Sequence, residues 1–83
     1  MKLQTKSWPL AKQVGECIRH LRLELGMNQE QFAEKCGFFR TYLSRIETGC
    51  ANPTLSALEV IANALDLSVF EFFELVNKHT GLR

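Results

Sequence analysis

The chain has 83 residues, of which 46% are hydrophobic and 23% charged, and its formal net charge is +1. This length allows one small domain, and the composition is typical of a soluble globular protein. No apolar run reaches the roughly 18–20 residues of a membrane span, and the first ten residues lack the apolar core of a signal peptide, so we expect a cytoplasmic protein without membrane partners.

Apolar residues at three- and four-residue steps predict an amphipathic first helix over residues 11–25: Leu10, Val14, Cys17, Ile18, Leu21 and Leu25. Gly26 is expected to end it, since glycine readily takes the left-handed conformation of a C-terminal cap. Asn28 and Gln31 have the spacing of a capping box, which predicts a short second helix over residues 29–36. The predicted inward residues of this helix are Phe32, Ala33 and Cys36.

A third helix is predicted over residues 39–48, between Gly37 and Gly49, with Leu43 and Ile46 facing inward. The next helix is separated from it by Asn52-Pro53, because a residue before proline is biased away from helix.

Thr54 can cap a fourth helix, whose predicted inward face is Leu55, Leu58, Ile61, Ala62 and Leu65. Ser68 and Glu71 form a second capping box and begin a fifth helix that extends from Val69 to about Lys78. No alternating strand pattern occurs, so we predict an all-α domain of five short helices.

The segment Gln29–Thr48 has the residue types of a helix-turn-helix, in which two helices cross at a wide angle through a tight turn. Ala33 is small where the second helix must approach closely, and Gly37 can supply a positive φ in the turn. The positions expected to bury against the first and fourth helices are apolar: Phe32, Cys36, Phe38, Leu43 and Ile46.

Val14–Leu75 resembles the Cro/cI-type (XRE-like) helix-turn-helix family of repressors and regulators. The resemblance is carried by these stretches: Ile18-Arg19-x-Leu21-Arg22, Asn28-Gln29-Glu30-Gln31-Phe32-Ala33, Cys36-Gly37-Phe38, Tyr42-Leu43-Ser44-Arg45-Ile46-Glu47-x-Gly49, and Asn52-Pro53-Thr54-x-x-x-Leu58-x-x-Ile61-Ala62-x-x-Leu65. It implies a compact five-helix, lambda-repressor-like domain over residues 10–83 that binds double-stranded DNA with its third helix in the major groove. Among relatives, the chain resembles in size the restriction–modification controllers, Cro-like phage repressors and some antitoxins. We favour an autoregulatory repressor or controller.

Two residues depart from the family pattern. Phe39 stands where Ser or Thr usually caps the recognition helix, and a phenyl ring cannot accept the free N–H groups, so the cap must come from elsewhere or be weaker. Asp66 stands where glycine is common, although aspartate tolerates the left-handed region better than most residues.

The start and outward face of the third helix are the expected base-contacting surface: Arg40, Thr41, Ser44 and Arg45. The forked donors of arginine match guanine O6 and N7, and Thr41 could touch a thymine methyl group or a phosphate. Expected phosphate contacts are Gln29, Tyr42, Thr48 and Asn52, and Gln29 stands at a helix N-terminus, which favours anions. The resemblance also implies an ion pair between Arg22 and Glu47 that orients the recognition helix.

The fifth helix carries a wider apolar arc than one core-facing stripe needs. We interpret the excess as the seam of a two-fold homodimer that binds a palindromic site, with tighter wrapping of the small core as the alternative. The expected interface residues are Val69, Phe70, Phe73 and Asn77. Residues 1–9 are predicted to form an N-terminal arm, in which Lys2, Lys6 and Trp8 could reach toward DNA. The alternatives are a frayed terminus, or a Trp8 side chain that simply packs on the domain.

Residues 1–45 hold eight Lys or Arg against four Glu, which fits an anionic partner of the N-terminal half.

Other kinds of function have less support. Cys17, Cys36 and Cys50 form no C-x-x-C pair, and although Cys17 and His20 could hold part of a metal site, we expect no metal or cofactor. No catalytic constellation is evident, so we predict a protein that is not an enzyme. The remaining alternative is an antitoxin-like module that binds another protein, such as a toxin, on the same fold.

Overall fold

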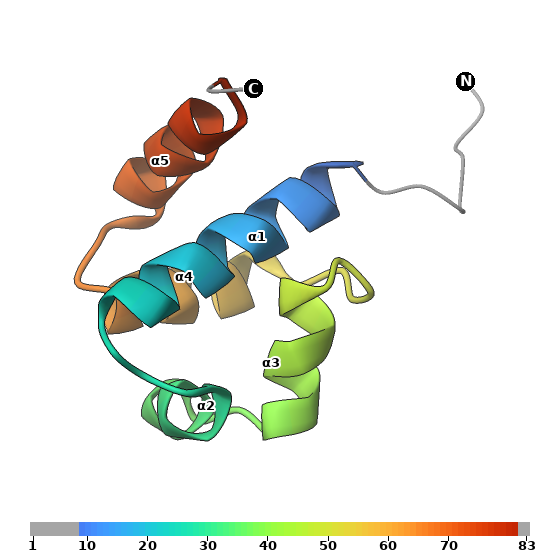
Figure 1. Cartoon of the computed structure of the whole chain (residues 1–83), viewed down its shortest axis with the longest axis vertical. Helices are drawn as coiled ribbons and strands as arrows, with labels where there is room; N and C mark the ends of the chain where they lie inside the picture. Colours follow the sequence, from blue (N-terminus) through green and yellow to red (C-terminus); the bar gives the residue numbers. More distant parts are fainter. Residues whose placement is uncertain (1–8, 82–83) are drawn as a thin grey trace.

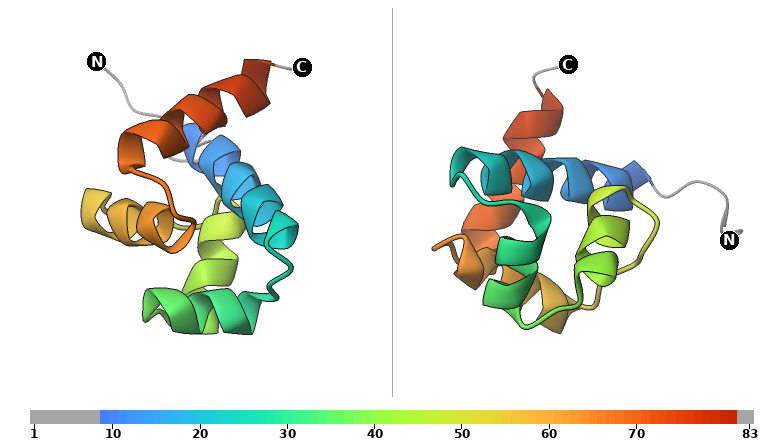
Figure 2. Two further views of the ribbon diagram at one scale, coloured as in Figure 1. Left: turned by 90° about the vertical axis from the view of Figure 1, so that its left-hand side faces the viewer. Right: turned by 60° about the horizontal axis from the view of Figure 1, so that its bottom comes forward.

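The computed structural model of the chain describes residues 9–81 and contains, over that range, five α-helices and no strand. The helices are α1 (Pro9–Glu24), α2 (Gln29–Cys36), α3 (Arg40–Glu47), α4 (Leu55–Ala64) and α5 (Val69–Gly81). α1 crosses the middle of the molecule, with α2 and α3 on one side of it and α5 on the other (Figures 1 and 2). The predicted all-α, five-helix class is confirmed.

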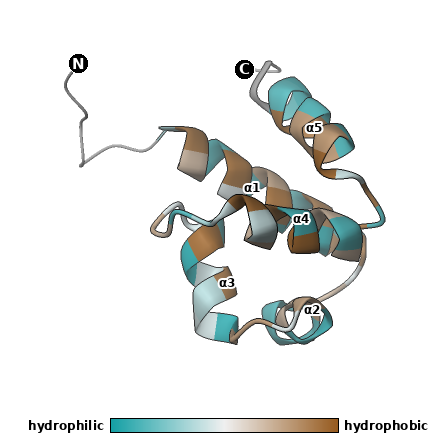
Figure 3. Ribbon diagram, turned by 180° about the vertical axis from the view of Figure 1, so that it is seen from behind, coloured by the Kyte–Doolittle hydropathy of each residue, from teal (hydrophilic) through white to brown (hydrophobic). Residues whose placement is uncertain are grey.

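The core lies where the inner faces of all five helices meet. α1 packs against α3 and α5, α2 packs against α3 and α4, and α4 packs against α5. The largest fully buried side chains are Phe32, Phe72, Ile18, Leu43, Ile46, Ile61 and Cys17. α2 is hydrophilic over most of the ribbon visible in Figure 3, and only Phe32 and Ala33 of this helix are buried.

Three predicted caps are present at the N-termini of α2, α4 and α5. The backbone N–H of Gln31 donates to Asn28 Oδ1 at 2.8 Å, and the Asn28 N–H donates to Gln31 Oε1 at 2.9 Å. The Ala57 N–H donates to Thr54 Oγ1. The Ser68 N–H donates to Glu71 Oε1, and the Glu71 N–H donates to Ser68 Oγ. These local bonds fix where each helix begins because they satisfy donors that have no partner inside the helix.

Several boundaries and inward residues differ from the prediction. α1 begins at Pro9 rather than Ala11, α3 begins at Arg40 rather than Phe39, and α5 continues past Lys78. Leu55, predicted to face inward, is 79% exposed, and Leu10 and Leu25 are also exposed. All three stand at or just beyond helix ends, where the neighbouring helices no longer cover the apolar stripe. Cys36 and Phe38 are only half-buried.

Candidate nucleic-acid interface

The turn between α2 and α3 is set by Gly37 and the two phenylalanines that follow it. Gly37 has φ +77°, in the left-handed region that its lack of a side chain permits, and the Phe38 N–H donates to the Ala33 carbonyl at 2.8 Å. The chain is then extended at Phe39 and enters α3 at Arg40. The short turn holds the two helices in the wide-angled arrangement seen in Figure 1.

The N-terminus of α3 has no side-chain cap. Phe39 occupies the N-cap position, its carbonyl accepts hydrogen bonds from Tyr42 and Leu43, and its side chain makes no capping bond. Among residues 9–81, no other side chain is seen to replace the cap that Ser or Thr would provide at this position.

α3 has a buried face and an exposed face. Leu43 and Ile46 are fully buried in the core, so the opposite side of the helix must face outward. Three of the four predicted base-contacting residues, Arg40, Thr41 and Arg45, are exposed, and Ser44 is half-buried. The orientation of α3 follows from its amphipathic pattern, because an eight-residue helix has room for one buried stripe.

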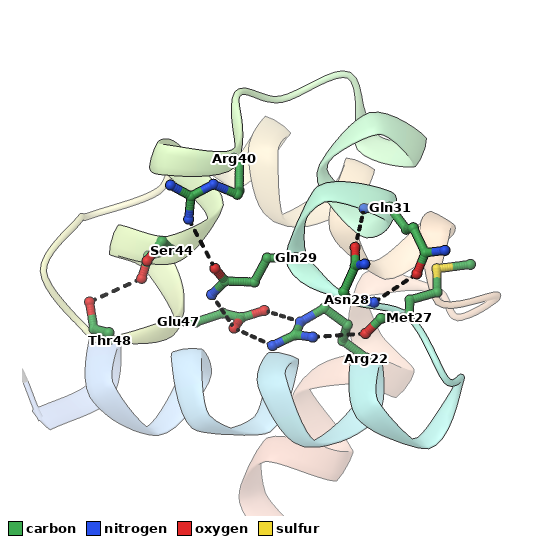
Figure 4. A network of polar contacts seen from close by, with 9 residues as sticks. All are labelled: Arg22, Met27, Asn28, Gln29, Gln31, Arg40, Ser44, Glu47 and Thr48. Carbon is green, nitrogen blue, oxygen red and sulfur yellow. Dashed lines mark hydrogen bonds and ion pairs between the residues drawn. The ribbon is translucent and has the colours of Figure 1, made fainter.

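A buried ion pair ties α3 to α1 (Figure 4). Arg22 Nε donates to Glu47 Oε2 at 2.7 Å and Arg22 Nη2 donates to Glu47 Oε1 at 2.9 Å, a bidentate geometry. Arg22 Nη1 donates to the Met27 carbonyl at 2.8 Å, so this guanidinium also holds the loop between α1 and α2. Both residues are buried, and the ion pair that the resemblance implied is present.

The same network continues outward through Gln29. Gln29 Nε2 donates to Glu47 Oε1 at 3.1 Å, and Arg40 Nη1 donates to Gln29 Oε1 at 3.4 Å. A chain of polar contacts thus runs from the buried Arg22 to the exposed Arg40 at the start of α3 (Figure 4). Gln29 stands at its centre, with hydrogen bonds to both Glu47 and Arg40.

Several of the other predicted contact residues also have intramolecular partners. Arg45 Nη2 donates to the Cys50 carbonyl at 3.2 Å, and Thr48 Oγ1 donates to the Ser44 carbonyl at 3.0 Å. The Tyr42 ring meets Phe38 edge-on with centroids 5.1 Å apart, and Asn52 is exposed in the loop after α3.

Gly15 is a structural determinant that the sequence analysis missed. A Cβ at this position would collide with the backbone carbonyl oxygen of Ile46 and lie 2.8 Å from that of Glu47. The absence of a side chain therefore lets α1 approach the C-terminal turn of α3 closely enough for the Arg22–Glu47 pair to form. The available signal was a glycine in the middle of an amphipathic helix, which usually has a packing reason.

All three cysteines lie in the described part of the chain. Cys17, Cys36 and Cys50 are free thiols. Burial raises the pKa of the Cys36 thiol to about 11 and also raises the pKa of Cys17, so both stay protonated at neutral pH. Among residues 9–81, no three His, Cys, Asp or Glu side chains gather to hold a metal ion.

α5 divides its apolar residues between the core and the solvent. Phe72 and Val76 are buried, Val69 and Phe73 are half-buried, and Phe70 is 81% exposed. Asn77, the fourth predicted interface residue, is also exposed. None of the five helices described is long and apolar enough to cross a membrane. The residues of the predicted N-terminal arm, Lys2, Lys6 and Trp8, lie outside the described residues.

Comparisons with known proteins agree with this geometry. Residues 18–72 match the helix-turn-helix family HTH_3. The chain is 40% identical over 62 residues to an uncharacterized HTH-type transcriptional regulator, y4dJ, of Sinorhizobium fredii, covering 75% of this chain and 80% of that protein. It is 45% identical over 56 residues to the immunity repressor protein of Bacillus phage phi105, covering 68% of this chain but only 39% of the repressor.

Solved structures of a restriction–modification controller protein, C.Esp1396I, have the same fold. The wild-type controller superposes with a TM-score of 0.84 at 38% identity, covering 93% of this chain and 100% of the controller chain. The tetramer of that controller in complex with its natural 35 base-pair operator matches with a TM-score of 0.81 at 40% identity, covering 88% of this chain and 96% of that one.

Proposed function

Because the chain belongs to the XRE-type helix-turn-helix family of DNA-binding transcription regulators, we propose that it is a repressor or controller that binds a palindromic operator as a homodimer. In this proposal α3 enters the major groove of double-stranded DNA. The relatives support it, since they include a phage repressor and a controller crystallised on its operator.

The observation that carries the proposal is the exposed face of α3. Arg40, Thr41 and Arg45 point away from a helix whose other side is fully buried, and the Arg22–Glu47 pair fixes that helix in place. A rigid helix with two outward arginines can present forked donors to guanine, each good contact giving roughly 1–3 kcal/mol of discrimination.

The remaining contact residues have assigned roles within the proposal. Ser44 stands with the arginines as a base-contacting residue, and Gln29, Tyr42, Thr48 and Asn52 contact phosphates. Gln29 also holds Arg40, so a phosphate contact by Gln29 would set the depth at which Arg40 meets the bases. The bonds that Arg40 and Arg45 make in the unbound protein are on exposed side chains and can be exchanged for contacts to DNA.

The dimer of this proposal forms through α5. This helix lies on the opposite side of α1 from α2 and α3, so a seam at Phe70 leaves the exposed face of α3 free (Figures 1 and 2). A two-fold axis through the seam would present two recognition helices to the half-sites of a palindrome. The family consists of DNA-binding regulators rather than enzymes, and we infer a cytoplasmic role without catalysis.

The proposal is tested by selecting DNA with the purified chain from fragments of the genome that encodes it. Wild-type protein at near-physiological salt should enrich a short palindrome. The variant Arg40→Ala/Arg45→Ala should enrich none, whereas Arg19→Ala, which removes an exposed charge from α1, should enrich the same site.

Circular dichroism should show unchanged helix content for all three proteins. Failure of the wild type to enrich any sequence would overturn the proposal and favour a protein-binding module. Undiminished enrichment by the double variant would show that α3 does not read the site.

A further inference from the structure

Phe39 is the most exposed large apolar residue in the described part of the chain, and the fold gives it no structural task. Its side chain is 85% exposed, so it adds little to the core. It also leaves the N-terminus of α3 without a side-chain cap, although serine or threonine at this position would supply one. The neighbouring Phe38 differs, since its ring is half-buried and packs against Tyr42.

Phe39 stands at the N-terminal end of α3, where the proposed recognition surface begins. It directly precedes Arg40, at the end of α3 whose residues reach base edges first when such a helix enters the major groove. The polar network of Gln29 and Arg40 lies beside this end of the helix and is anchored on the buried Glu47 (Figure 4). In the proposed complex, residue 39 therefore lies next to Arg40 at the end of α3 that enters the groove.

The chemistry of the groove limits what a phenyl ring can meet there. The ring has no hydrogen-bond donor or acceptor, so it cannot read the edges of guanine, adenine or cytosine. The one apolar group that a base pair presents in the major groove is the C5-methyl group of thymine, which phenylalanine can contact. Burying both surfaces together removes apolar area from water.

Building on the proposed function, we propose that Phe39 is a specificity-determining residue that contacts the C5-methyl group of a thymine beside the base read by Arg40. The residue gives up the capping bond of α3 and supplies an apolar contact that a capping serine or threonine hydroxyl cannot. Each half-site of the operator then requires a thymine, or another pyrimidine that carries a 5-methyl group, at that position.

The test removes single methyl groups from the DNA. The operator is first recovered by selection with the wild-type protein, and symmetry-related pairs of thymines are then replaced with deoxyuridine, one pair at a time. At one pair, wild-type affinity should fall about four-fold for each methyl group lost, which is the value for burying one methyl-sized group. Phe39→Ser should bind the thymine and deoxyuridine sites equally well, and Phe39→Leu should keep part of the difference.

Thr41→Ser is the matched control, because Thr41 carries the only methyl group among the exposed residues of α3 and is the other side chain there that could contact a thymine methyl group. This variant should retain the deoxyuridine effect at the pair assigned to Phe39. The inference is overturned if no thymine pair shows the effect, if Phe39→Ser still shows it, or if Thr41→Ser abolishes it. A wild type that binds its operator without any methyl dependence overturns this inference alone, whereas a wild type that selects no site overturns the proposed function as well.

Discussion

At the residue scale, the N-cap of α3 is the helix start at which an exposed phenylalanine stands in place of a capping side chain. The helices α2, α4 and α5 each have a side-chain cap. In each of them one N–H group of the first turn donates to the side chain of Asn28, Thr54 or Ser68. Phe39 gives the corresponding donors of α3 no side-chain acceptor. Residues kept for function are often the ones whose replacement stabilises a protein.

Replacing Phe39 with serine should therefore stabilise the fold while it weakens DNA binding. The new hydroxyl can accept an N–H bond of α3, a gain of about 1 kcal/mol, which corresponds to a rise of about 4–8 °C in Tm for a domain of this size. Thermal unfolding followed by circular dichroism measures the change in Tm.

Thr54→Ala is the matched control for the serine variant. It removes the existing cap of α4 and should lower Tm by a similar amount. A lower Tm for Phe39→Ser would mean that the phenyl ring contributes packing in solution and that the missing cap is not the dominant effect.

At the element scale, the position of α3 depends on its contact with α1. Gly15 permits the close approach, and the Arg22–Glu47 pair then joins the two helices. Glu47 also bonds Gln29, so the same carboxylate connects α1, α2 and α3 (Figure 4). Changes at this contact should alter DNA binding through the placement of α3.

Gly15→Ala should destabilise the protein by about 1–3 kcal/mol or more, because the added methyl group collides with backbone carbonyl groups of α3 that cannot rotate away. The sign of the change in the free energy of unfolding shows whether α1 and α3 are in close contact at this position. In a helix interior with free space, replacing glycine by alanine stabilises by about 1 kcal/mol. Urea unfolding measures the free energy, and a stabilised variant would show that α1 and α3 are farther apart in solution.

Breaking the Arg22–Glu47 pair one partner at a time should be costly. Arg22→Met or Glu47→Leu leaves a buried charge without its partner, and each should destabilise by about 3–5 kcal/mol. The double variant Arg22→Met/Glu47→Leu should recover much of that loss, since two apolar side chains replace two charges. Urea unfolding of the wild type and the three variants gives the coupling free energy between Arg22 and Glu47. If the losses in the free energy of unfolding were additive, a direct interaction between the two residues would be contradicted.

At the scale of the whole molecule, α5 and α3 lie on opposite sides of α1 (Figure 1). Mutations can therefore test the proposed self-association through α5 separately from the proposed DNA contact through α3. The matched controller structure was crystallised as a tetramer on its operator, which makes association the property to test in this chain.

Phe70→Arg should convert a dimer into a monomer that keeps its helix content. The ring is 81% exposed within one chain, so its loss removes little from the core, whereas two arginines facing each other across a two-fold axis repel. Sedimentation equilibrium should show the monomer, and affinity for a palindrome should fall at least about ten-fold while a half-site is bound as before.

Leu55→Arg is the control for the dimer variant, because Leu55 is equally exposed but stands on α4. It should leave the dimer intact. A dimer that survives Phe70→Arg would place the seam elsewhere and contradict the assignment of Val69, Phe70, Phe73 and Asn77.

The sequence by itself determined the five helices, their caps and the turn at Gly37, because these depend on hydrogen bonds and backbone preferences among residues close together in the chain. The amphipathic pattern also decided which face of α3 is buried. The family resemblance, not the pattern, indicated that Arg22 and Glu47 would pair across 25 residues.

Only the tertiary structure decided which apolar residues the core covers and how the contact residues are held. Leu55 fits the helical stripe of α4 yet lies in solvent, since burial depends on where the neighbouring helices end. The reason for Gly15 and the path from Glu47 through Gln29 to Arg40 arise between helices that pattern alone cannot place. Periodicity records which face of a helix turns inward, but close approach and shared hydrogen bonds are properties of the assembled helices.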